Sequence, residues 1–153
     1  MSAGVHSATL IKRFGSRHGV LSALSRRWIA AIPAGPTASG GRTELWEWAA
    51  SVSHAGTSSA QMLSRIGMLH EDLADEELRG LLHQGWQKQI RYLQSLIEGA
   101  CKSGQLPGVV DPETAASLLL DVAHGCILRA AAAPDPANVN PKTAVQQLLK
   151  GWE

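Results

Sequence analysis

Apolar residues recur at intervals of three and four along most of this 153-residue chain, and no stretch alternates polar and β-branched residues over the length of a strand. The longest such segment starts at the acidic cluster after Ala74, continues from Leu78 to Cys101, and meets the stop signals Lys102 and Gly104. This spacing places apolar side chains on one face of a helix. The sequence therefore predicts an all-α protein.

Helix boundaries follow from capping residues, glycine and proline. Asp111 and Asn140 each precede a proline, which suits the first helical position because the N–H that it lacks would be unpaired there anyway. Thr43 is expected to cap a helix that ends at Gly56, and Ser58 begins a capping box for a second, shorter helix. The expected helices cover about 7–14 (broken at a glycine), 16–32, 43–56, 58–69, 75–101, 112–132 and 141–152.

Charge is distributed unevenly between the two ends of the chain. Residues 1–43 hold six basic and no acidic side chains, a net charge of +6, whereas residues 44–153 hold 8 basic and 13 acidic ones, a net charge of −5. A basic head on an acidic body suggests an anionic partner at one end only. Charge alone leaves three explanations open: a nucleic-acid surface, a transit peptide, or a solvated face.

Residues 33–42, PAGPTASGGR, have the composition of a linker. The expected organisation is therefore a head of residues 1–32, a linker of residues 33–42, and a helical body of residues 43–153.

Several functional classes lack support. The two cysteines, Cys101 and Cys126, have no partner at metal-ligand or disulfide-framework spacing, and the six histidines show no metal-binding pair. The most apolar stretch, residues 115–133, is interrupted by Asp121, His124 and Arg129, which favours a buried helix over a membrane span. No hydrolase or nucleotide-binding motif occurs. We expect a soluble, cytoplasmic, non-enzymatic protein without a metal, a cofactor or a membrane partner.

One segment of the head contains a specific sequence motif. Residues 3–24, AGVHSATLIKRFGSRHGVLSAL, resemble the turn, recognition helix and following helix of tetracycline-repressor family regulators. The matching positions are Ala3, Gly4, Val5, Thr9, Leu10, Phe14, Ser16 and Leu21, with Arg17 where the family has lysine. The resemblance implies a helix-turn-helix whose small residues let the helix backbone approach base edges in the major groove of an operator. The residues that it places near double-stranded DNA are Ser7, Ala8, Thr9, Lys12, Arg13 and Arg17, and it implies that Arg17 holds a phosphate.

The resemblance starts late in the motif. The family's first helix and most of its second would precede Ala3, and the family's serine and tyrosine are replaced by His6 and Ile11. Two accounts stay open: the start of the protein lies upstream, or the chain is a relative that dimerises and binds a ligand without reading DNA.

The body resembles the same family less specifically, in the string GQLPGVVDPETAASLLLDVAHGCILRA. That resemblance implies a homodimer built on a four-helix bundle of the last two helices, with interface candidates Leu119, Val122, Cys126, Val145, Leu148, Leu149 and Trp152. A pocket for a small apolar effector is expected among the body helices, with lining candidates Trp46, Met62, Ile66, Trp86, Ile90 and Leu93. Ordinary intrachain core is the alternative for both sets.

The resulting prediction is a ligand-responsive DNA-binding transcriptional regulator that acts as a repressor. The runner-up is a helical effector-binding and dimerisation module without DNA binding. A third reading, an organellar protein whose basic head is a transit peptide, disagrees with the ungapped motif.

Overall fold

The computed structural model describes residues 12–37, 41–52, 58–135 and 138–153. Within these residues the regular secondary structure is helical and includes no strand, which confirms the all-α prediction. The elements are α2 (Arg17–Ala31), α3 (Arg42–Ser51), α4 (Ser59–Ala74), α5 (Glu76–Lys102), α6 (Pro112–Ala132) and α7 (Pro141–Gly151). Residues 12–14 are also helical, and Gly15, with a φ of 77°, separates them from α2.

The predicted caps are present at the start of three helices. The Asp111 side chain accepts a hydrogen bond from the Glu113 N–H, and the Asn140 side chain accepts one from the Lys142 N–H. Ser58 forms the complete capping box that begins α4. These bonds satisfy N–H groups that the first turn of a helix leaves without a partner.

Two expectations for the middle of the chain were wrong. Helix α3 begins at Arg42, its N-cap is Gly41 with a φ of 63°, and no side chain caps it, so Thr43 lies inside the helix. Gly41 is buried, where a Cβ would lie 3.5 Å from the Ala100 nitrogen of α5, and its positive φ is a backbone conformation that residues with a side chain rarely adopt, which favours glycine at this turn. Helix α4 has 16 residues and is longer than α3, which has 10 and ends before the predicted stop at Gly56, outside the described residues.

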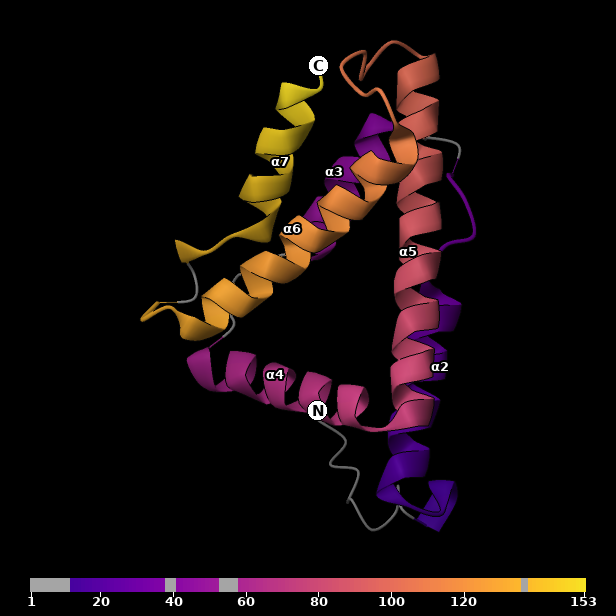
Figure 1. Cartoon of the computed structure of the whole chain (residues 1–153), viewed down its shortest axis with the longest axis vertical. Helices are drawn as coiled ribbons and strands as arrows, with labels where there is room; N and C mark the ends of the chain where they lie inside the picture. Colours follow the sequence, from indigo (N-terminus) through magenta and orange to yellow (C-terminus); the bar gives the residue numbers. More distant parts are fainter. Residues whose placement is uncertain (1–11, 38–40, 53–57, 136–137) are drawn as a thin grey trace, which may run out of the picture.

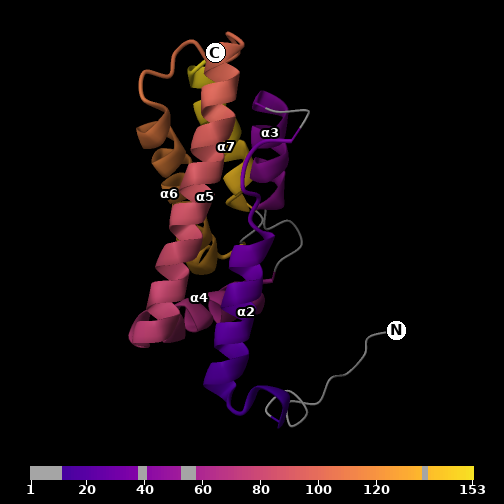
Figure 2. The same ribbon diagram turned by 90° about the vertical axis from the view of Figure 1, so that its right-hand side faces the viewer.

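Three helices form a triangle in Figure 1. Helix α5 is the long upright side, α6 descends diagonally from its upper end, and α4 runs across the base into the start of α5. Helix α2 packs along the lower half of α5, and α3 and α7 pack with the upper half of the molecule (Figures 1 and 2).

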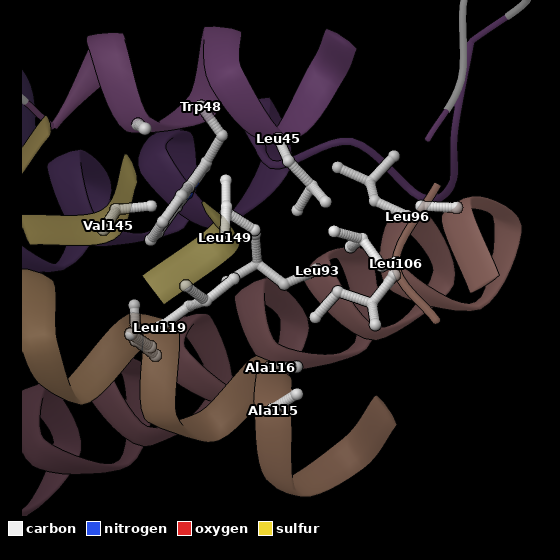
Figure 3. Packing of buried hydrophobic residues seen from close by; sticks show 14 of the residues in the cluster. Leu45, Trp48, Leu93, Leu96, Leu106, Ala115, Ala116, Leu119, Val145 and Leu149 are labelled. Atoms are coloured by element: carbon white, nitrogen blue, oxygen red, sulfur yellow. The ribbon is translucent and has the colours of Figure 1, made fainter. Parts of the chain in front are cut away.

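The main hydrophobic core lies at the upper end, between α3, α5, α6 and α7 (Figure 3). Fully buried leucines meet there from different helices: Leu45 from α3, Leu93 and Leu96 from α5, Leu119 from α6 and Leu149 from α7. The lower half has fewer buried residues, so α4 and the ends of α5 and α6 enclose space there instead of a packed core.

Helix α6 is the one helix of the described residues that is long and apolar enough to cross a membrane, with a mean hydropathy of 1.4 over its most apolar window. Core helices of soluble proteins have the same length and composition, and one face of α6 is buried in the main core.

Candidate ligand cavity and its connection to the basic end

A cavity of about 310 Å³ lies between the three helices of the triangle. Its lining comes from α4 (Arg65, Ile66 and Leu69), α5 (Leu82 and Trp86) and α6 (His124, Ile127 and Leu128). Six of these eight side chains are apolar, and the remaining two are a cation and an imidazole. An apolar hollow with few polar groups is typical of a small-molecule site.

A second cavity of about 270 Å³ adjoins the first, because Arg65, His124 and Ile127 line both. It extends toward α2 and α3, where its lining includes Trp28 and Val52. The two polar residues of the first cavity therefore stand where the two spaces meet.

His124 is held against Trp86, with the two ring centroids 5.2 Å apart and the rings tilted by 49°. Burial lowers the pKa of His124 from its ordinary value, and the nearby Asp121 carboxylate opposes that shift. At neutral pH the imidazole is therefore uncharged, with one nitrogen that donates a hydrogen bond and one that accepts.

The six predicted lining residues do not all reach this cavity. Ile66 and Trp86 line it together. Met62 and Leu93 are fully buried, and Trp46 and Ile90 pack against the main core. Arg65 and His124 were not among the predicted lining residues. The imidazole of His124 inside the apolar α6 was a usable signal, whereas Arg65 lies in a helix with several other polar residues.

Near the C-terminal end of α4, the basic head contacts acidic side chains. Arg17, the first residue of α2, donates hydrogen bonds of 2.8 and 2.9 Å to the two carboxylate oxygens of Glu71. Arg26 of α2 contacts Glu77 of α5 at 3.1 Å, and His18 lies 3.3 Å from Asp75. The predicted phosphate-binding residue Arg17 is therefore occupied by a carboxylate of the same chain.

The other predicted DNA contacts lie at the start of the described chain. Lys12 and Arg13 are exposed on the helical residues 12–14, and the Arg13 guanidinium lies 5.6 Å from the centre of the Phe14 ring. Ser7, Ala8 and Thr9 lie outside the described residues. No side chain of these six is placed against nucleic acid, so their role stays a prediction.

Three predicted interface residues have no surface to offer a second copy. Leu119, Val145 and Leu149 are fully buried in the core of this chain, and Cys126 is nearly so. Intrachain packing, the alternative given by the sequence, accounts for their apolar spacing, and their place in an interface stays a prediction. Val122, Leu148 and Trp152 are partly buried against the same core. Leu118 and Leu128 of α6 are instead 41% and 56% exposed, and the sequence analysis did not single them out.

The comparisons with known proteins give one structural relative. No protein-family model matches the sequence, and no curated protein matches it. The solved structure of Salmonella enterica GusR superposes with a TM-score of 0.59 at 22% identity, covering 95% of this chain and 79% of that one. This likeness establishes that the two chains share a helical fold.

Proposed function

We propose that this chain is a cytoplasmic, homodimeric, ligand-responsive regulator of transcription, which acts as a repressor and carries out no catalysis. The observation that carries the proposal is the double contact of α4. Ile66 and Leu69 of this helix line the cavity, and Glu71, less than one turn after Leu69, binds Arg17 at the start of α2. A ligand that moves α4 therefore acts directly on the basic end of the molecule.

Such coupling requires that the effector bind one arrangement of the heads better than another. The helix that would transmit the change is held at both ends: by the capping box at Ser58 and by the turn at Asp75, which is the C-cap of α4 and the N-cap of α5. A shift at the cavity is therefore expected to move α4 as a unit. The GusR-like fold supports a regulator of this type.

The test is selection of binding sites from random double-stranded DNA with the full chain at low salt. A regulator enriches a palindromic site, because a two-fold dimer places two heads on one duplex. Lys12→Gln and Arg13→Gln should each weaken binding to all sequences and lower the salt slope by about 1. Arg91→Gln, which removes an exposed arginine of α5, is the matched control.

The second candidate is an effector-binding and dimerisation module that does not bind DNA. The pairing of Arg17 with Glu71 and of Arg26 with Glu77 favours it, because both cations already have anionic partners. If selection enriches no site and the chain binds no duplex even at low salt, this second function replaces the first.

A further inference from the structure

The cavity between α4, α5 and α6 has a basic side chain but no acidic side chain in the described part of its lining. Its single formal charge is the Arg65 guanidinium of α4, and its other polar side chain is His124 of α6. No aspartate or glutamate belongs to the lining of this cavity or of the adjoining one among the described residues. Two acidic groups lie near the cavity without lining it. Asp72 lines a neighbouring space with Leu82 and Trp86 but not with Arg65 or His124, and the Asp121 carboxylate acts on His124 from the same helix.

From this arrangement, and resting on the proposed function, we propose that the effector is a small monocarboxylic acid with an apolar ring. Its carboxylate binds Arg65 and the His124 N–H, and its ring lies among Ile66, Trp86 and Ile127. The sequence predicts an apolar effector, and this proposal adds a carboxylate to its apolar ring.

The chemistry of Arg65 suits this role. A guanidinium has five N–H donors in a planar fork and binds a carboxylate through two of them, so it can do so while keeping a further contact elsewhere. Arg65 is exposed, whereas His124 is partly buried, so the acid group lies at the side of the cavity that opens to solvent. An ionised group placed there keeps part of its hydration, which reduces the cost of binding it.

The apolar part of the lining suits a ring. Trp86 presents an aromatic ring that is already packed against His124, and such rings favour tilted or offset neighbours. Ile66, Leu82 and Ile127 supply aliphatic walls from all three helices. The volume of about 310 Å³ is at the small end for ligand cavities, which favours one ring over several.

Binding of such an acid can affect the basic head through α4. Arg65 lies six positions before Glu71, on the same helix. An acid bound at Arg65 therefore contacts the same helix whose last turn binds Arg17 through Glu71.

The test is calorimetric titration of the full chain with 4-phenylbutyrate, its primary amide and 4-phenylbutylamine. These probes share one ring and one chain and differ in charge. We expect the acid to bind about 10-fold more tightly than the amide, since a charge-assisted hydrogen bond exceeds a neutral one by about that factor. The amine should bind most weakly, because it meets the Arg65 cation.

Three variants locate the interaction. Arg65→Met should bring the affinity for the acid within about 2-fold of that for the amide while leaving the amide unchanged. Arg91→Met, outside the cavity, should change neither the affinity for the acid nor that for the amide. Leu69→Trp narrows the cavity and should weaken the binding of the acid and of the amide by the same factor.

The proposal is overturned if the amide or the amine binds as tightly as the acid, if Arg65→Met retains the preference for the acid, or if none of the probes binds at millimolar concentration. These titrations contain no DNA. A failure to find an operator therefore overturns the regulatory function alone, and a failure of the acid preference overturns the ligand class alone.

Discussion

The Arg17 guanidinium contacts both carboxylate oxygens of Glu71, at 2.8 and 2.9 Å, and so ties the first residue of α2 to the last turn of α4. The two residues are 54 positions apart in the sequence, and the arginine side chain is 74% exposed. The cation that the helix-turn-helix resemblance assigns to a DNA phosphate is thus shared with the helix that lines the cavity. Glu71 is positioned to compete with DNA for Arg17.

Removal of either partner of this ion pair should change DNA binding in opposite directions. Glu71→Gln frees Arg17 for a phosphate and should raise affinity for the selected site by up to about 5-fold, since an exposed pair contributes at most about 1 kcal/mol. Arg17→Gln should lower affinity and reduce the salt slope by about 1. Fluorescence anisotropy at several salt concentrations measures both, and a shift in the same direction for the two variants would contradict the competition.

Tyr92 is the only tyrosine of the chain, so its ionisation can be followed directly by the ultraviolet absorbance of the phenolate. Burial, and then the nearby Glu44 carboxylate, raise the pKa of Tyr92 from 10.0 to about 12. The hydroxyl donates a hydrogen bond of 3.1 Å to Glu44, which also accepts one from the Thr37 N–H at 2.7 Å. A titration midpoint near 12 is expected for the folded protein.

The sign of the linked stability follows from the raised pKa. The contribution of Tyr92 is fully present below pH 10 and is lost as the pH rises through about 12. Glu44→Gln should lower the titration midpoint but leave it above 10, because burial, the largest cause, remains. Glu47→Gln, which removes the smallest of the effects that raise the pKa of Tyr92, is the control and should shift the titration midpoint less. A midpoint near 10 while circular dichroism still reports folded helix would disprove the arrangement.

Gly85 lets α2 approach α5. A Cβ at this position would lie 2.0 Å from Cζ3 of Trp28, whereas a Cβ at Gly80 on the same helix would meet nothing within 4 Å. Gly80→Ala should stabilise the protein by about 0.5–1 kcal/mol through helix propensity alone. Gly85→Ala has the same propensity gain but must displace the indole, so it should be about 1–3 kcal/mol less stable than Gly80→Ala. Urea unfolding of the two variants measures this difference, and equal stabilities would show that Trp28 moves aside without cost.

Leu118 tests the proposed dimer. It is exposed on α6, in line with Val122 and Gly125 one and two turns further along the helix. Leu118→Glu should weaken dimerisation at least about 10-fold by placing a charge in an apolar contact, while leaving the fold of each chain intact. Leu63→Glu, at a leucine of α4 that is 60% exposed, serves as the control. Sedimentation equilibrium gives the association constants, and a dimer unaffected by Leu118→Glu would place the interface elsewhere.

Features that depend on neighbouring residues were predictable from the sequence. The caps at Ser58, Asp111 and Asn140 each bind an N–H two or three positions later, so a short stretch of sequence contains both partners. The starts of α6 and α7 followed directly from these caps and their prolines. The same reasoning failed at α3, because Gly41 begins that helix through its packing against α5 and not through a local cap.

Features that depend on how helices meet required the tertiary structure. Helix α6 is apolar on most of its surface, so periodicity could not separate Leu119, which is buried, from Leu118, which is exposed. The cavity joins residues of three helices, and His124 becomes part of it only because α6 crosses α4 and α5 there. The sequence by itself determined the helices and the basic head, since those depend on nearby residues; the cavity and the link from Glu71 to Arg17 were decided by packing between segments far apart in the chain.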